Sequence, residues 1–153
     1  MSVHESFLSA MSKFQSSNPN LELPPKSFTE MKGEVVEFHP NGQLSVEFPF
    51  DPRFTNPMGV FQGGMLGTAV DNVFGPLSYF VAQGPCVTLD MHLRFTKPFL
   101  SRDESILVRA EVKSHTSRML VMDASVHSKQ GELIALATTQ FMKLDGQLVK
   151  PLR

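Results

Sequence analysis

Apolar and polar positions alternate most strictly over residues 86–96. Successive side chains of a β-strand point to opposite faces, so this pattern predicts a long, half-buried strand. Three further strands are predicted over residues 105–115, 119–128 and 132–143, with turn-forming residues between them. In the first strand the apolar face holds Val87, Leu89, Met91, Leu93 and Phe95, and the polar face holds Thr88, Asp90, His92, Arg94 and Thr96. The polar face, Thr88 included, should point away from the core.

A short amphipathic helix is expected at the N-terminus, within residues 1–18. Ser2 and Glu5 have the spacing of a capping box, and Asn18-Pro19 ends the helical pattern. The apolar residues at helical spacing are Phe7, Leu8, Met11 and Phe14. We expect this helix to pack on the body of the protein, with a lid over an acyl channel as the alternative.

A hairpin is predicted after a connection that contains three prolines, residues 19–27. Residues 28–38 and 43–48 are strand-like, and His39-Pro40-Asn41-Gly42 between them is typical of a turn. The first third of the chain therefore predicts a helix, a linker and two paired strands.

A long apolar helix is predicted to begin at Gly63 and to run to about Ala82. It is apolar nearly all round, so we expect protein to cover most of its surface. Gly75-Pro76 interrupts the pattern, because proline removes a backbone hydrogen bond and clashes with the carbonyl four residues back. The sequence therefore predicts a kink near Asn72, or a helix that restarts.

One long helix followed by four consecutive strands, after an initial hairpin, is typical of an α+β fold. Such strands form an antiparallel sheet, and the helix lies against one of its faces. A length of 153 residues suits one domain, 1–153, with a sizeable core. The tail, residues 144–153, is expected to add a short strand or to fray.

Asp71 is the only charged residue between Thr55 and Leu89, and its neighbours in sequence are apolar. An isolated carboxylate in such surroundings either shifts its pKa or finds strong partners. It could cap a loop or pair with a distant Arg, or it could be a general base or nucleophile. Asp71 is therefore the first candidate for catalysis.

Gly63 and Gly64 stand where this helix begins, after a loop with turn residues at Asn56, Pro57 and Gly59. The first N–H groups of a helix have no partner within the helix, and the helix dipole attracts negative charge to that end. Because glycine has no side chain, a substrate oxygen can come close to these amides. The position suits an oxyanion hole.

The spacing of these candidates resembles a known family. Asn56 is followed after six residues by Gly63, then after seven residues by Asp71, and later by V-T-L-D-M-H at 87–92. This pattern resembles the hotdog-fold thioesterases of the phenylacetic-acid-pathway type, which carry N…HGG…D. The likeness is closest over residues 54–99 and extends more loosely to about residue 143. It implies a hotdog fold, in which an antiparallel sheet wraps around one long helix, and hydrolysis of an acyl-coenzyme A thioester.

The resemblance also implies roles for individual residues. The Gly63 N–H and the Asn56 amide polarise the thioester carbonyl, and Asp71 activates a water or attacks directly. Thr88 aligns with a hydroxyl that assists at the active site, although the alternation of residues 86–96 turns it away from the helix. Gln62 replaces the family's His; it can donate and accept hydrogen bonds but cannot become cationic, and we expect it to bind substrate together with Gly64.

A dimer is predicted from the distance between the two halves of this site. Gly63 and Asp71 are eight residues apart on one helix, about 12 Å. A thioester carbon must lie within a few ångström of both its oxyanion donor and its attacking water. Two antiparallel copies of the helix bring Gly63 of one chain beside Asp71 of the other, as the resemblance also implies. We expect a homodimer with shared active sites, and pairing of such dimers into a tetramer.

The composition excludes several other classes of protein. A net charge of -1 without a basic run argues against nucleic-acid binding. No apolar run reaches membrane-spanning length, and the N-terminus lacks the pattern of a signal peptide. A single Cys86 and five scattered His show no metal-binding spacing. We therefore expect a cytoplasmic protein with no metal and no cofactor.

Two other functions are compatible with a hotdog fold. A non-catalytic acyl-binding module is favoured by the missing His, and a hydratase or dehydratase would need an acid/base His that the sequence does not offer near Asp71. The nature of the acyl group stays open. The basic residues near predicted strand ends, where coenzyme A phosphates could dock, are Lys97, Arg102, Lys113 and Arg118.

Overall fold

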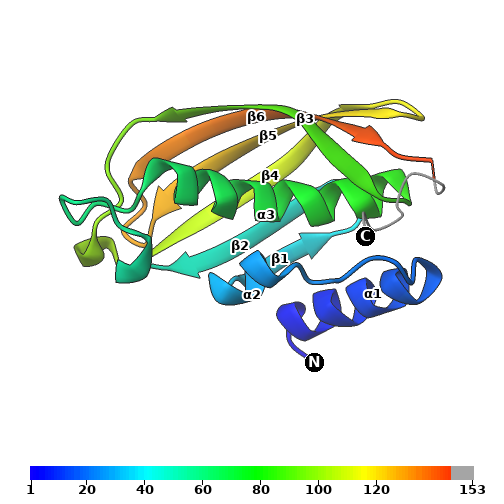
Figure 1. The fold of residues 1–153 in the computed structure, drawn as a ribbon, viewed down its shortest axis with the longest axis horizontal. Coiled ribbons are helices and arrows are strands. Elements are labelled where there is room, and N and C mark those ends of the chain that lie inside the picture. The colour runs from blue at the N-terminus through cyan, green and yellow to red at the C-terminus, as the bar shows by residue number, and fades with distance from the viewer. Residues whose placement is uncertain (146–153) are drawn as a thin grey trace.

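A computed structural model of the chain describes residues 1–145, and in it one long helix lies across a face of a six-stranded antiparallel sheet (Figure 1). The strand order is β1-β2-β4-β5-β6-β3. The elements are α1 (Val3–Ser17), α2 (Lys26–Glu30), β1 (Glu34–His39), β2 (Gln43–Pro49), η1 (Pro52–Phe54), α3 (Gly63–Ala82), β3 (Cys86–Phe95), η2 (Ser101–Asp103), β4 (Ser105–His115), β5 (Met119–Ser128) and β6 (Leu133–Lys143). The predicted α+β arrangement is confirmed.

The core lies between α3 and the inner face of the sheet. Alternate residues of the central strands point inward, and the cross-strand pairs Leu44 with Ala110 and Val108 with Val126 are buried together. From α3, the buried side chains that meet this face include Val70, Val73, Phe74 and Leu77. Burial of these apolar surfaces holds the helix in one orientation on the sheet, and this orientation fixes where Asp71 lies.

α1 begins as predicted, with a reciprocal capping box. The Glu5 amide donates to Ser2 Oγ at 3.1 Å, and the Ser2 amide donates to Glu5 Oε2 at 2.6 Å. Phe7 and Met11 bury the apolar face of α1 beside β1 and the second half of α3. The helix therefore packs on the body of the protein, as expected from its sequence.

The strand predicted over residues 28–38 is wrong in its first part. Residues 26–30 form the short helix α2, and β1 begins only at Glu34. Phe28 and Met31 are three residues apart, a helical rather than a strand spacing, and both are buried. Lys32, with φ 55°, then turns the chain toward β1. The hairpin from β1 to β2 through residues 39–43 is confirmed.

α3 runs without interruption from Gly63 to Ala82, with Pro76 inside it, so the predicted restart does not occur. Tertiary packing compensates for the backbone hydrogen bond that proline removes, because Pro76, Leu77 and Ser78 are all buried against the sheet or its neighbours. A short strand or fraying is expected for the tail, residues 144–153. Residues 146–153 lie outside the described part of the chain.

Candidate functional site

Asp71 lies in the middle of α3 and faces β3. Its Oδ1 accepts a hydrogen bond of 3.0 Å from Thr88 Oγ1, and the side chain is half-buried. Among residues 1–145, Asp71 has no ion-pair partner, so neither a loop cap nor an Arg explains it. The structure therefore brings Thr88 to Asp71, although the alternation of residues 86–96 predicts that Thr88 points away from the helix.

A β-bulge in β3 explains this meeting. Thr88 pairs with Phe141 of β6, but the next pair is Asp90 with Gln140, so Leu89 is an extra residue in β3. One extra residue reverses the in–out alternation of a strand. Thr88 therefore shares the inner face with Met91 and Leu93, while Val87 and Leu89 are turned outward and are 39% and 49% exposed. The prediction that Thr88 points away from the helix is wrong.

Burial raises the pKa of the Asp71 carboxyl above its ordinary value of 3.8, and the hydrogen bond from Thr88 opposes this shift in part. Burial disfavours the charged form, while a donor to the carboxylate favours it. A carboxylate of raised pKa is a stronger base than an exposed Asp. Thr88 leaves Oδ2 free for a water or a substrate atom.

A hollow of about 380 Å³ opens beside this carboxylate. One side is formed by α3, with Pro76 and Tyr79, and another by the start of β3 and by Phe141 of β6. The third side comes from the segment between α1 and α2, which includes Leu21, Leu23 and Pro25. The walls are thus largely apolar, and Asp71 is the charged group on the α3 side.

The start of α3 forms a second hollow, of about 420 Å³, lined by Asn56 and Gly63 together with residues 95–99. The amides of Met65 and Leu66 donate to Gln62 O, so the first two helical amides, of Gly63 and Gly64, are those left for a ligand. A Cβ on Gly63 would lie 3.1 Å from the ring of Phe95. The close approach of this ring is a reason for glycine that sequence reasoning missed.

The loop before α3 is held by the Asn56 side chain. Its Oδ1 accepts from the amides of Met58 and Val60, at 2.9 and 3.1 Å. The Asn56 backbone closes the same turn, donating to Val60 O and accepting from Gly59 N. Since the oxygen is used for the turn, the Nδ2 group is the part of the amide that remains for a substrate carbonyl.

Gln62 caps α3 through its backbone alone. Its amide donates to Phe54 O at 2.8 Å, and its side chain, which is exposed, makes no capping hydrogen bond. Gly64 is also exposed, and a Cβ there would meet nothing within 4 Å. Both residues therefore border open space at the helix start, where a substrate could reach them.

The two hollows are separate within one chain. One holds Asn56 and Gly63, and the other holds Asp71 and Thr88. Of the predicted site residues, the structure thus brings Asp71 to Thr88 and Asn56 to Gly63, but does not join the two pairs. This agrees with the helical distance that led us to predict a second chain.

The other candidates from the sequence are Cys86 and four basic residues. The Cys86 thiol is buried, burial raises its pKa, and its Sγ lies 3.8 Å from Ser78 O. A nucleophilic cysteine needs a lowered pKa and access to the substrate, so Cys86 does not suit this role. Of the four basic residues, Lys97 lines the Gly63 hollow and bonds Glu132 at 2.9 Å. Lys113 and Arg118 belong to the opposite end of the sheet, around the turn from β4 to β5.

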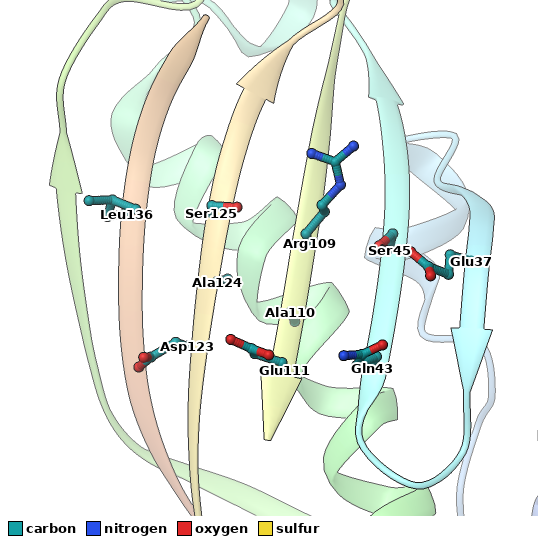
Figure 2. A pocket seen from close by; sticks show the side chains of 10 residues that line it. All are labelled: Glu37, Gln43, Ser45, Arg109, Ala110, Glu111, Asp123, Ala124, Ser125 and Leu136. Carbon is teal, nitrogen blue, oxygen red and sulfur yellow. Dashed lines mark hydrogen bonds between the residues drawn. The ribbon is translucent and has the colours of Figure 1, made fainter. Parts of the chain in front are cut away.

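A further hollow lies on the outer face of the sheet, around Arg109, Glu111 and Asp123 (Figure 2). Its charged and small polar side chains come from β1, β2, β4 and β5 and point away from α3. None of the predicted site residues contributes to it. We therefore place the candidate site on the helix side of the sheet.

In residues 1–145, no cluster of three or more His, Cys, Asp or Glu side chains could hold a metal ion. A membrane-spanning helix of sufficient length and apolarity is likewise not found in that part of the chain.

Residues 35–142, well over half of the chain, match the sequence profile of the family described as acyl-CoA thioesterase C-terminal domain. The chain belongs to this family. No curated protein sequence matches it. Family membership supports thioesterase activity in general terms, and it leaves the mechanism and the substrate to be argued from the site.

Solved structures with the same fold include three proteins of 14–20% sequence identity. The Escherichia coli PaaI protein of the phenylacetic acid degradation operon has a TM-score of 0.75 and 14% identity over 88% of this chain and 96% of its own. Thioesterase HI1161 of Haemophilus influenzae has a TM-score of 0.71 and 16% identity, covering 83% and 87%. Streptococcus mutans smu.793, bound to acetyl CoA, has a TM-score of 0.68 and 20% identity, covering 73% and 88%.

These likenesses confirm the predicted hotdog fold. The narrower assignment to the phenylacetic-acid-pathway type stays a prediction, since it rests on the motif of Asn56, Gly63 and Asp71.

Proposed function

We propose that the protein hydrolyses an acyl-coenzyme A thioester, with Asp71 as the base or nucleophile. The observation that carries this proposal is the Asp71 carboxylate itself: it is half-buried, its pKa is raised, it is hydrogen-bonded to Thr88, and it lines a largely apolar hollow. A perturbed carboxylate beside a cavity in a thioesterase family is suited to activate water.

In this mechanism the Gly63 N–H and Asn56 Nδ2 bind the thioester oxygen, and the positive end of the α3 dipole stabilises the oxyanion. As a base, Asp71 Oδ2 takes a proton from water while the hydroxide adds to the carbonyl carbon, and the C–S bond then breaks. As a nucleophile, Asp71 attacks that carbon itself, the C–S bond breaks to leave a mixed anhydride, and water then hydrolyses the anhydride and frees Asp71. In both routes the coenzyme A thiolate leaves and is protonated. The products are a carboxylic acid and coenzyme A.

The two halves of the site come from two chains in this proposal. A stripe of α3 that is left only partly covered in one chain contains Gly64, Thr68, Asp71 and Gly75. A Cβ on Gly64 or Gly75 would meet nothing within 4 Å, so there is room beside this stripe. β3 is the edge strand next to it and exposes Val87, Leu89 and Phe95. An unpaired, partly apolar edge suits antiparallel pairing with a second copy. Pairing of such dimers into a tetramer stays a prediction.

The direct test is release of free thiol from acyl-CoAs of increasing chain length, aliphatic and aromatic, by the purified protein. We expect turnover with at least one of them. The Asp71→Asn protein, purified in parallel, controls for contaminating esterases. Binding of acyl-CoA without thiol release would instead support the alternative of a non-catalytic acyl-binding module, which the replacement of the family's His by Gln62 favours.

Thr88→Val should move the acid side of the pH–rate profile to higher pH. The hydrogen bond from Thr88 holds the pKa of Asp71 below the value that burial alone gives. Without that bond the pKa rises, so Asp71 becomes protonated, and inactive as a base, at a higher pH than in the wild type.

The measurement is kcat/KM against pH, with Thr138→Val as a matched control. Thr138 lies on the outer face of β6 and its hydroxyl does not contact Asp71. An unchanged acid limb in Thr88→Val, or one moved to lower pH, would show that Asp71 is not the titrating base.

Gln62→His should keep the fold and at least the wild-type turnover. The Gln62 side chain is exposed and makes no capping hydrogen bond, so its replacement should shift the melting temperature by no more than about 2 °C. An imidazole at the start of α3 adds a donor beside the oxyanion hole. Thermal unfolding and kcat on one acyl-CoA check this; loss of binding would reveal a role for Gln62 beyond hydrogen bonding.

A further inference from the structure

One wall of the Asp71 hollow comes from a part of the chain that the family profile does not cover. The match begins at residue 35, whereas Leu21, Leu23 and Pro25 belong to the connection between α1 and α2. Figure 1 shows this connection running back between α1 and α3. The hollow is therefore built partly from residues that match the family profile and partly from the N-terminal segment before them, residues 1–34.

The N-terminal segment, residues 1–34, is fastened to α3 on both sides of the wall. Before it, the Phe14 ring of α1 stacks on Tyr79, with centroids 5.8 Å apart. After it, Ser27 Oγ of α2 donates to Asn72 Oδ1 at 2.9 Å. Tyr79 and Asn72 both belong to α3 and both line the same hollow as Asp71. The wall is thus held in place relative to the carboxylate.

The wall contributes three apolar residues to the hollow, Leu21, Leu23 and Pro25, and two polar ones, Glu22 and Ser27. Leu21, Leu23 and Pro25 are each partly buried, and Leu23 packs against the hydrophobic core. The Glu22 side chain is exposed, and its Oε1 lies 3.6 Å from Lys26 Nζ. Pro76, Cys86 and Phe141 form the surfaces of the hollow contributed by α3, β3 and β6. A volume of about 380 Å³ is near the low end for a small-molecule site.

We propose that Leu21 and Leu23 determine the acyl specificity of the protein. This inference rests on the proposed function, in which the reacting carbonyl lies at Asp71. The apolar acyl group extends from that carbonyl into the hollow, and the side chains of Leu21 and Leu23 limit its length. Coenzyme A, which is polar and larger than the hollow, extends the other way, out of the site.

Two opposite substitutions at one position test the wall. Leu23→Ala shortens the side chain and should let longer acyl groups enter, whereas Leu23→Phe fills the hollow and should restrict the enzyme to shorter ones. Each CH₂ that finds an apolar place is worth about a fourfold change in affinity. We therefore compare two acyl chains, the one that the wild type prefers and one that is two carbons longer. The ratio of kcat/KM for the longer chain to kcat/KM for the preferred chain should be roughly tenfold higher in Leu23→Ala than in the wild type.

Leu8→Ala is the matched control. Leu8 is also a partly buried leucine of the N-terminal segment that packs on the core, but it does not line the hollow. It should lose stability without changing the order of preferred substrates. Thermal unfolding of all three variants shows whether each is folded under the assay conditions.

The chain-length profile, measured by thiol release, decides the outcome. Opposite shifts of the preferred chain length in Leu23→Ala and Leu23→Phe, with an unchanged profile in Leu8→Ala, support the proposed role of the wall in acyl specificity. Rates that fall by the same factor for every acyl length in both Leu23 variants overturn it, although the protein would still be a thioesterase. Absence of thiol release by the wild type with every acyl-CoA overturns the proposed function, and the wall with it.

Discussion

Asp71→Asn is expected to lower kcat by at least about a hundredfold, the scale of a lost acid/base group. Asn is nearly the same size as Asp, and its Oδ1 can still accept the hydrogen bond from Thr88. It cannot take a proton from water or form an acyl-enzyme. The change therefore removes the chemistry and keeps the packing of α3 against β3.

The stability of this variant separates catalysis from folding. Burial raises the folded-state pKa of Asp71 above 3.8, so the folded protein disfavours the ionised form. A raised pKa means that stability is lost as the pH rises from the ordinary Asp pKa through the folded-state pKa. At pH 7 the wild type carries that cost and Asp71→Asn does not.

The melting temperature of Asp71→Asn at pH 7 should thus equal or exceed that of the wild type, and the difference should shrink below the ordinary pKa of Asp. Thermal unfolding at both pH values and kcat on the best acyl-CoA are the measurements. Wild-type turnover in a folded Asp71→Asn protein would remove Asp71 from the mechanism.

Much of the sheet could be predicted because its alternation is regular. The bounds predicted for β4 and β5 coincide with those observed, and β6 begins one residue later than predicted. The start of α3 was predictable for a local reason as well: a glycine pair followed by a long apolar run marks a helix N-terminus whether or not the rest of the fold is known.

Thr88 shows where periodicity fails. The alternation of residues 86–96 is unbroken in sequence, but Leu89 is an extra residue in the pairing of β3 with β6. A bulge depends on the partner strand, and it leaves no mark on the alternation of its own strand. The structure places Thr88 beside Asp71, on the face opposite to the one that the alternation predicts, and its role at the site stays a prediction.

The wall of the Asp71 hollow could not be predicted for a related reason. Leu21 and Leu23 stand among prolines in a segment without periodicity, so their sequence gives no face or partner. Their place depends on the long-range contacts of Phe14 with Tyr79 and of Ser27 with Asn72. Only the folded chain shows that the segment reaches Asp71.

A site shared between two chains makes a strong prediction for mixed oligomers. Asn56→Asp keeps the oxygen that binds the Met58 and Val60 amides but replaces the Nδ2 donor, and loss of one oxyanion donor costs about a hundredfold or more. Asp71→Asn removes the base. Each variant alone should be nearly inactive, because every site in its homodimer carries a defect.

In a mixed dimer of these two variants, one shared site receives both damaged residues and the other receives Asn56 and Asp71 intact. Random exchange makes half of the dimers mixed, so activity should return to about one quarter of the wild-type value. Subunits are exchanged by co-expression of the two variants with different affinity tags, and mass spectrometry verifies equal amounts of each.

Thiol release by this mixture is the most direct test of a thioesterase site in which Asn56 and Gly63 of one chain act with Asp71 of another. The prediction is recovery to about one quarter of wild-type turnover, from two proteins that are each nearly inactive. A mixture that contains both subunits in one oligomer and stays as inactive as its components would contradict it, because a site contained in one chain keeps its defect in every combination.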